Sequence, residues 1–198
     1  MKVLLRALCV GFVFAVLASL VTFEGECREI SNEVFRVHIL ANSDSEEDQT
    51  LKLKVRDAVV DKSNELLSDV HSKEEAKNIV NKNLNVFLNT AKDVIFSEGY
   101  DYDIKISVVN MYFDTRYYDN VTMPGGFYDA LRIEIGKAEG KNWWCVMYPS
   151  LCLFSSSDRD DLDNKLSKKQ YGIVTSKGKY KYKLRFVEMF NNFLDMFK

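Results

Sequence analysis

An uncharged run from Ala7 to Phe23, directly behind Lys2 and Arg6, constrains this chain more than any other feature. At about 1.5 Å of rise per residue, a helix of this length nearly spans a hydrocarbon core of about 30 Å. A basic flank stays on the cytoplasmic side, so the remainder of the chain is expected to be exported. We therefore predict that residues 1–24 are a signal peptide or an N-terminal membrane anchor. Residues 3–23 would contact the membrane before any cleavage.

The sequence leaves open whether this segment is cut. The spacing of small residues between Ala18 and Gly25 is poor for a signal-peptidase site, which favours an anchor or a late cut. A buried core helix is a third interpretation. It is disfavoured because the run lies at the extreme N-terminus behind basic residues.

The composition is that of an ordinary globular protein, with 46% hydrophobic and 28% charged residues over 198 positions. This length suggests one domain, or one domain with an appendage. The formal net charge of −2 gives no electrostatic footprint for nucleic acid, so we expect no nucleic-acid partner.

Hydrophobic periodicity predicts the secondary structure. Alternating patterns predict strands over 33–41, 102–113, 127–138 and 142–149. A 3.6-residue repeat predicts two helices, one over 46–69 behind a capping box of Ser43 and Glu46, and one over 72–98 behind a box of Ser72 and Glu75. The segment 114–126 is typical of a turn-rich connection.

The element order β-α-α-β-β-β-α, after the export segment, predicts an α+β fold. A mostly antiparallel sheet of about four strands would carry the helices on one face. We assign residues 33–152 to this domain, and residues 153–198 to a polar connection and a C-terminal amphipathic helix. The stripe of that helix predicts docking on the core, with a membrane-surface helix as the less common alternative.

Export permits disulfides, and Cys145 and Cys152 flank a turn favoured by Pro149 and Ser150. A disulfide between them would close a small loop. The alternative is two buried thiols, which is a common state of cysteine.

No convincing catalytic set emerges from the sequence. His38 is the histidine that resembles part of a constellation, because Asn42, Ser43 and Asp44 follow it closely. A strand histidine followed by turn and helix-capping residues is the more common arrangement. We therefore expect a binding or signalling protein rather than an enzyme.

Metal and cofactor motifs are also missing from the sequence. A zinc site needs convergent Cys, His or carboxylate ligands, and His38, Cys145 and Cys152 would meet only by accident of the fold. There is no phosphate-binding or dinucleotide glycine pattern. We expect no metal, no cofactor and no small-molecule substrate.

Trp143 and Trp144 stand side by side on a predicted strand, so their side chains should point to opposite faces. One is expected to fill the core. The other, if exposed, would be a suitable anchor for a protein interface.

Three stretches together resemble the stage II sporulation protein R family of endospore-forming bacteria. They are the export segment, FRVHILANSDSEEDQTLKLKVRDAV (35–59) and PGGFYDALRIEIGKAEGKNWWCVMYPSLC (124–152). HILANSD and NWWCV are the most specific of these motifs. Two turns depart from the family pattern, at Pro124-Gly125-Gly126 and at Pro149-Ser150-Leu151-Cys152, and both keep residues that favour turns.

The resemblance implies an intercellular signal. Such a protein is made in the forespore and exported into the space between the forespore and mother-cell membranes, secreted or held by its N-terminus. There it activates a membrane-embedded, aspartic-type protease of the mother cell, which processes the sigma-E precursor. The family member is an activator and not the protease.

For the partner-binding surface, we predict one end of the sheet, where polar and glycine residues follow or precede strands. The residues are His38, Asn42, Ser43, Asp44, Gly125, Gly126 and Tyr128, with Trp143 or Trp144 as an anchor. The alternative function is an exported enzyme, a cell-wall hydrolase or a thiol oxidoreductase, that uses His38 or Cys145.

Overall fold

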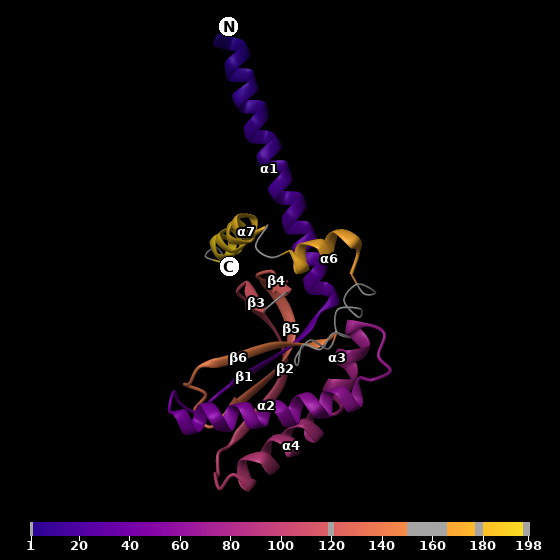
Figure 1. The fold of residues 1–198 in the computed structure, drawn as a ribbon, viewed down its shortest axis with the longest axis vertical. Coiled ribbons are helices and arrows are strands. Elements are labelled where there is room, and N and C mark those ends of the chain that lie inside the picture. The colour runs from indigo at the N-terminus through magenta and orange to yellow at the C-terminus, as the bar shows by residue number, and fades with distance from the viewer. Residues whose placement is uncertain (1, 119–120, 150–165, 177–179, 196–198) are drawn as a thin grey trace. The chain divides into compact units, whose positions relative to one another are not determined.

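The computed structural model describes residues 2–118, 121–149, 166–176 and 180–195, with side chains up to Met189. The chain divides into two compact units (Figure 1). The first comprises Met1–Asn32, Tyr112–Phe127 and Leu166–Lys198, and the second comprises Glu33–Met111 and Tyr128–Lys165. Residues 112–127 group with the N-terminal and C-terminal segments. The predicted division into residues 33–152 and 153–198 stays a prediction.

A four-stranded sheet in the order β2-β5-β1-β6 forms the base of the second unit. Its strands are β1 (Phe35–Leu40), β2 (Ile104–Phe113), β5 (Gly126–Ile135) and β6 (Asn142–Tyr148), of which β2 and β5 continue into the first unit. β1 pairs antiparallel with β6 and parallel with β5. The predicted α+β class with a mostly antiparallel sheet is confirmed.

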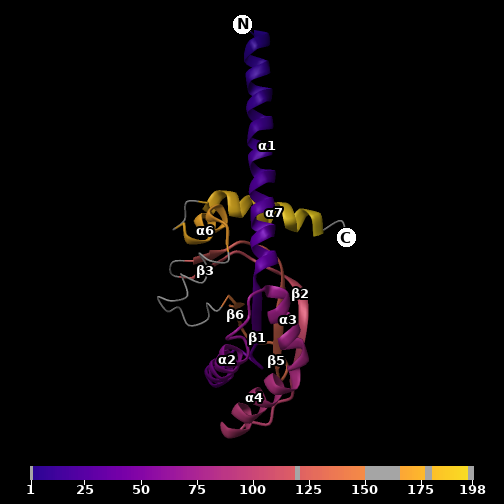
Figure 2. The same cartoon turned by 90° about the vertical axis from the view of Figure 1, so that its right-hand side faces the viewer.

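Three helices pack against one face of this sheet, as predicted (Figure 2). They are α2 (Glu46–Leu66), α3 (Lys73–Lys82) and α4 (Leu84–Ser97). Their apolar stripes and alternate residues of the strands form one core, because a helix repeats its face every three or four residues and a strand every two. The buried members include Val37, Ile39, Leu51, Val55, Val59, Ala76, Val80, Phe87, Ala91, Ile95, Leu131, Ile133 and Ile135.

The single helix predicted over 72–98 is interrupted at Asn83. The Asn83 side-chain Nδ2 donates to the Ile79 carbonyl at 2.8 Å, and its backbone N–H reaches the carbonyls of both Ile79 and Val80. Asparagine competes in this way with the regular helical hydrogen bonds. α3 and α4 therefore meet at a break that the hydrophobic stripe alone does not reveal.

The predicted start of α2 is confirmed, but its predicted cap is wrong. The N-cap is Ser45, whose Oγ accepts the backbone N–H of Asp48 at 3.1 Å. Ser43 and Glu46 do not form the expected capping box, since the Ser43 hydroxyl bonds the Asp48 carboxylate instead. Glu46, Glu47 and Asp48 lie in the first turn, where the helix dipole favours negative charge.

The first unit contains the long N-terminal helix α1 (Lys2–Glu33), a two-stranded hairpin, α6 (Lys168–Thr175) and α7 (Lys181–Asp195). The hairpin consists of β3 (Arg116–Tyr118) and β4 (Val121–Met123), paired antiparallel. The sequence predicted only a turn-rich connection here, because each strand has three residues, too few for a clear alternation. The predicted C-terminal helix is present as α7.

α1 changes character along its length. Its N-terminal apolar residues are exposed, and it is the described helix that is long and apolar enough to cross a membrane. Its C-terminal part is packed inside the first unit, where Phe23, Cys27 and Ile30 are buried. Lys169 and Gln170 of α6 bind Glu26 and Glu29 of this part. The chain from Phe23 onward is thus part of the folded unit.

Candidate functional site

The HILANSD motif builds a hydrogen-bonded cluster around Asp48 in the second unit. The Asp48 Oδ2 accepts the Asn42 side-chain Nδ2 at 2.8 Å and the Ser43 hydroxyl at 2.6 Å. Burial raises the pKa of Asp48, but hydrogen bonds from Ser43, Asn42, Tyr102 and Ser45 outweigh it and hold the pKa below its ordinary value. The carboxylate is therefore charged, and it fixes the turn between β1 and α2.

The same turn is hydrogen-bonded to the connection between β5 and β6. Asn42 Oδ1 accepts the Lys137 backbone N–H at 3.0 Å, and Asp44 Oδ1 accepts that of Lys141 at 2.6 Å. The Gly140 N–H donates to the Ala41 carbonyl at 3.0 Å. We call Asn42, Ser43, Asp44 and Asp48, with the 136–141 connection, the latch.

Two glycines allow this close approach. Gly136 has a φ of 59°, and a Cβ there would lie 2.3 Å from Asn42 Oδ1. A Cβ on Gly140 would lie 2.1 Å from the Ser43 carbonyl oxygen, which is backbone and cannot move aside easily. Lys52 adds a further bond, since its Nζ donates to the Lys141 carbonyl at 2.9 Å. HILANSD and the segment before NWWCV thus hold each other.

His38 is enclosed within this sheet rather than presented to a partner. Its side chain is 4% exposed, its Nε2 lies 2.8 Å from Asn142 Oδ1, and its ring meets Trp144 edge-on at 5.0 Å between centroids. Burial lowers the pKa of His38 below its ordinary value. The residue is a packed strand histidine, the more common arrangement for its position.

The tryptophans point to opposite faces, as predicted. Trp143 packs on the helix-covered core, with the Arg56 guanidinium 5.3 Å from its ring centroid. Trp144 lies against His38. Both are half-buried, so neither offers a fully exposed anchor.

The predicted grouping of the two glycines and Tyr128 with the HILANSD turn is wrong. β1 and β5 are parallel, with Phe35 opposite Asp129 and Leu40 opposite Glu134. Tyr128 therefore lies beside the start of β1, and the latch follows the end of β1. Tyr128 is also fully buried, with the Arg36 guanidinium 4.9 Å from its ring centroid.

Gly125 and Gly126 belong to the first unit. The Gly125 N–H donates to the Thr115 hydroxyl at 3.0 Å. A Cβ on Gly125 would lie 2.9 Å from Cγ of Glu188, so glycine allows α7 to approach this turn. The partner-binding role of the nine predicted residues stays a prediction.

Cys145 and His38 cannot act together as a thiol–imidazole pair. Cys145 is opposite Val37 in the β1–β6 pairing, and His38 is opposite Trp144, so the pleat directs their side chains to opposite faces of the sheet. The Cys145 thiol is buried in the helix-covered core. Cys152 lies outside the described residues, so the disulfide stays a prediction. Within the described ranges, no three Cys, His, Asp or Glu side chains converge as metal ligands would.

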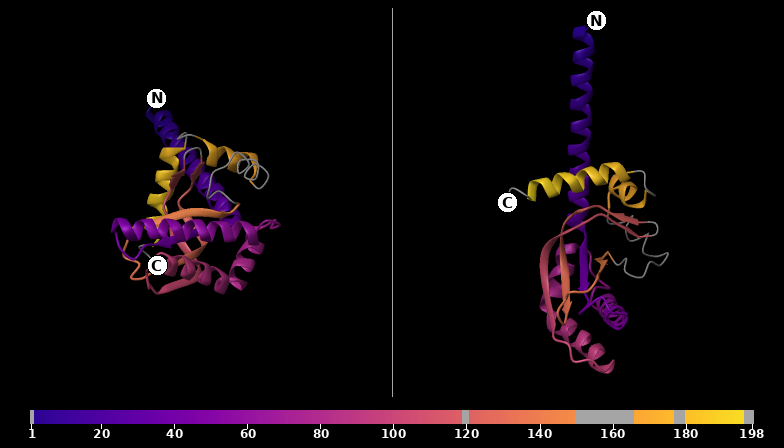
Figure 3. Two further views of the ribbon diagram at one scale, coloured as in Figure 1. Left: turned by 60° about the horizontal axis from the view of Figure 1, so that its bottom comes forward. Right: turned by 90° about the vertical axis from the view of Figure 1, so that its left-hand side faces the viewer.

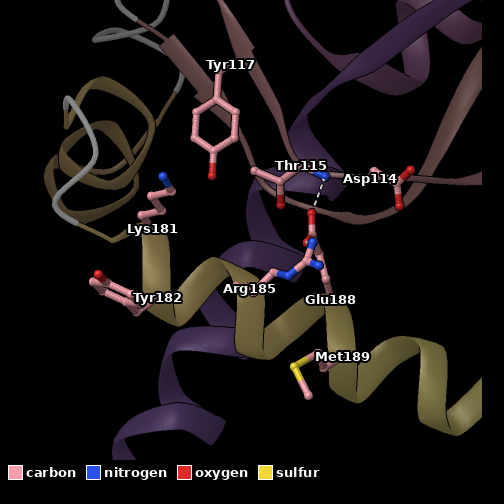
Figure 4. A pocket seen from close by; sticks show the side chains of 8 residues that line it. All are labelled: Asp114, Thr115, Tyr117, Lys181, Tyr182, Arg185, Glu188 and Met189. Carbon is pink, nitrogen blue, oxygen red and sulfur yellow. Dashed lines mark hydrogen bonds and ion pairs between the residues drawn. The ribbon is translucent and has the colours of Figure 1, made fainter.

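The first unit contains an open groove of about 580 Å³ between α7 and the residues around β3 (Figure 4). Glu188 closes one side of it, where its Oε1 accepts the Thr115 backbone N–H at 2.7 Å and its Oε2 accepts Arg185 Nη1 at 3.3 Å. The lining residues are Asp114, Thr115, Tyr117, Lys181, Tyr182, Arg185, Glu188 and Met189. The groove combines cationic and aromatic side chains.

The sequence patterns do not single out Asp48 and Glu188 as the carboxylates that organise their surroundings. Asp48 was readable as one of several acidic residues at a helix start, and its position three residues after Ser45 marks it as the partner of the true cap. Glu188 gives no such signal. Its partner Thr115 is 73 positions away in the chain, and only the fold brings them together.

Comparisons with known proteins agree with the sequence motifs. The model of the family "Stage II sporulation protein R" matches residues 31–158. The protein of that name from Bacillus subtilis (strain 168) is 37% identical over 145 residues, which span 71% of this chain and 65% of the relative's own length. No solved structure matches. The matched range contains the whole latch and ends before α6 and α7.

Proposed function

Because the chain belongs to the stage II sporulation protein R family and so has a role in sporulation, we propose that it is an exported signal that activates a membrane-embedded protease. That protease, of the aspartic type, would lie in the mother-cell membrane and process the sigma-E precursor. The chain itself would travel from the forespore into the space between the two membranes. The family match over residues 31–158 is the observation that carries this proposal.

Export is supported by α1. Its apolar residues are exposed over the run that follows Lys2 and Arg6, as expected for a helix that enters a bilayer from the cytoplasmic side. The burial of Phe23, Cys27 and Ile30 in the first unit supports an uncut anchor, or a cut upstream of Phe23. Removal of this part would leave the partners of Glu26 and Glu29 on α6 unsatisfied.

An activator of this kind works by binding one state of its receptor more tightly than another. Such a preference requires a surface of fixed shape, because a surface that deforms would fit both states. The latch provides that rigidity, since it joins the β1–α2 turn to the β5–β6 connection through side-chain and backbone bonds. In this role the polar residues of the motif act as positioning residues.

The contact with the receptor would lie on exposed residues beside the latch, Glu46 and Glu47, which we call the rim. Glu46 and Glu47 border a shallow cavity of about 290 Å³ together with Glu98 and Tyr100. Their carboxylates face solvent at the start of α2 and are available to a basic segment of the receptor.

The alternative, an exported enzyme that uses His38 or Cys145, has weaker support. The two side chains lie on opposite faces of the sheet, and both are buried. A nucleophile with a base must have both groups within hydrogen-bond reach of each other.

Reconstitution in a host that does not sporulate tests the proposal. The receptor protease and the sigma-E precursor are expressed with and without this chain, and processing is followed by the size of the precursor. Processing that requires the chain is expected. Equal processing without the chain, or none with it while the folded chain is present outside the cytoplasm, contradicts the proposal.

Charge reversal at Glu47 tests whether the rim contacts the receptor, without disturbing the latch. Glu47→Lys is expected to reduce processing without unfolding the chain, because Glu47 is exposed. Asp61→Lys is the matched control, since Asp61 is exposed on the same helix. Equal processing by both variants would remove the rim from the proposal and leave the activator role standing.

A further inference from the structure

α7 carries two apolar faces, of which the first unit uses one. Leu184 and Val187 are 3% and 2% exposed and pack inside the unit. Tyr182, Phe186 and Met189 are 89%, 40% and 64% exposed. These three follow at spacings of four and three residues, so they form one stripe along the helix. The predicted docking of this helix on the core therefore accounts for only one of its two apolar faces.

The position of α7 relates this stripe to the apolar run of α1. Both helices belong to the first unit. The Lys183 Nζ donates to the Ser19 hydroxyl at 3.0 Å and lies 5.4 Å from the ring centroid of Phe23, and Tyr180 stacks on Phe23 at 5.4 Å between centroids. The start of α7 is thus fixed at the C-terminal end of the apolar run.

The direction of α7 is equally informative. α7 crosses α1 rather than running alongside it (Figure 3). β3 and β4 lie on the side of α7 that faces away from the N-terminal end of α1 (Figure 1). Glu188, which is buried, accepts the backbone N–H of Thr115 beside β3. The exposed stripe lies away from Leu184 and Val187, and its residues Tyr182 and Met189 also line the open groove beside β3.

Basic residues flank the stripe. Lys181, Lys183 and Arg185 stand in the first two turns, against one acidic residue, Glu188, within the part of α7 whose side chains are described. A helix with an apolar face and basic flanks lies in the plane of a membrane interface, with its cations on anionic headgroups. Tyrosine is enriched at the same depth, because its ring is apolar and its hydroxyl remains hydrated.

We propose that α7 is an in-plane membrane helix, with Tyr182, Phe186 and Met189 in the interface of an anionic phospholipid bilayer and Lys181 and Arg185 on its headgroups. α1 crosses the bilayer, and α7 lies on the exported side at the level where the apolar run ends. The first unit then contacts the membrane at two places, through the membrane-spanning part of α1 and through the exposed stripe of α7. This proposal does not depend on which protein the chain activates.

Quenching of a new tryptophan by brominated lipid tests the contact. The full-length Phe186→Trp chain is reconstituted by α1 into vesicles of phosphatidylcholine and phosphatidylglycerol, with and without bromine on the acyl chains. The wild-type chain gives the signal of Trp143 and Trp144, which is subtracted. Met189→Trp, at the more exposed position, is a second probe of the same stripe.

We expect blue-shifted emission from the new tryptophan and quenching of at least about half of it by brominated lipid. Adding Lys181→Gln should weaken the contact by about fivefold, the equivalent of about 1 kcal/mol for one basic residue at an anionic surface. Lys168→Gln is the matched control, because it removes the same charge from an exposed position on α6.

Two outcomes would overturn the proposal. Red-shifted, unquenched emission from both probes would show that the stripe faces water. Blue-shifted but unquenched emission would show that protein covers it, either a second copy or another partner. Neither result bears on protease activation, which is measured in the reconstituted host.

Discussion

The two units of this chain use charged and polar residues in different ways. In the second unit, the polar residues of the family motif bond inward, to Asp48 and to the 136–141 connection. In the first unit, the cations of α7 and its apolar stripe remain on the surface. The polar residues of the HILANSD motif therefore hold the fold together. Surfaces that contact a partner are expected beside this motif or in the first unit.

The tryptophans allow the two units to be measured separately. Trp143 and Trp144 are the only tryptophans in the sequence, and both belong to the second unit. Their fluorescence therefore reports unfolding of that unit within the full-length chain. The lysines and arginine of α7 are trypsin sites, so their cleavage rate reports opening of the first unit.

Loss of Asp129 is expected to have the largest effect on the second unit. Its Oδ2 lies 2.9 Å from Lys73 Nζ and 3.1 Å from Lys77 Nζ, and its Oδ1 accepts Asn110 Nδ2 at 3.1 Å. Asp129→Ala leaves the buried Lys73 without its partner, which costs about 3–5 kcal/mol for a buried pair. The measurement is urea unfolding in detergent, followed by tryptophan fluorescence.

Lys77→Ala is the control for this change, because the Lys77 side chain is partly exposed and its loss should cost under about 1 kcal/mol. Equal losses of unfolding free energy for Asp129→Ala and Lys77→Ala would show that the buried Lys73–Asp129 pair does not stabilise the second unit.

Asp48→Ala should have the next largest effect, about 2–3 kcal/mol, because it removes an ionised acceptor shared by Asn42 and Ser43. Hydrogen exchange at the Lys137 and Lys141 amides should accelerate, since these groups are held by the latch. Asp61→Ala is the matched control on the exposed face of α2. Unchanged exchange at both amides would mean that the latch is not a cooperative element.

Local patterns predicted most of the second unit. The strands, the start of α2 and the helix-covered face follow from periods of two and 3.6 residues and from short-range capping. The break at Asn83 was not predicted, because the hydrophobic stripe continues through it. The β3–β4 hairpin escaped because its strands are short.

The arrangement of the candidate site could not be predicted in the same way. The parallel pairing of β1 with β5 joins segments about 94 positions apart, and it decides that Tyr128 and the latch lie at opposite ends of the strands. Whether Asn42 and Asp44 point to solvent or to a distant backbone also depends on that pairing. Local chemistry identified these residues as special, and only the fold shows that their bonds are internal.

Acid should weaken the second unit in two stages. Burial holds the pKa of His38 below 6.5, so His38 disfavours folding once the unfolded chain begins to bind its proton, and stability falls as the pH drops below about 6.5. The pKa values of Asp48 and Asp129 are below 3.8, so their stabilising bonds persist above that pH and are lost as the pH falls through the folded-state values.

Urea unfolding at pH 7.5, 5.5 and 2.5 checks both stages. His38→Asn should flatten the first stage, because asparagine does not titrate, and Asp48→Asn should reduce only the second. A loss of stability between pH 7.5 and 5.5 that persists in His38→Asn would assign the first stage to another group.

The smallest expected effect lies in the first unit. Glu188→Gln keeps an oxygen that can accept the Thr115 N–H but removes the negative charge beside Arg185. A hydrogen bond to a charged group contributes somewhat more than a neutral one, so we expect a loss of about 1 kcal/mol. This corresponds to an increase of about fivefold in trypsin cleavage at Lys181, Lys183 and Arg185.

Arg185→Gln is the matched control, because it removes the exposed side of the same pair and retains the buried Glu188–Thr115 bond. It should leave the cleavage rate at Lys181 and Lys183 within about twofold of the wild type, since surface ion pairs contribute little. If both variants accelerate cleavage equally, the ion pair rather than the buried bond holds α7. The inward-bonding carboxylate would then be a property of the second unit alone, and the contrast between the units would be sharper.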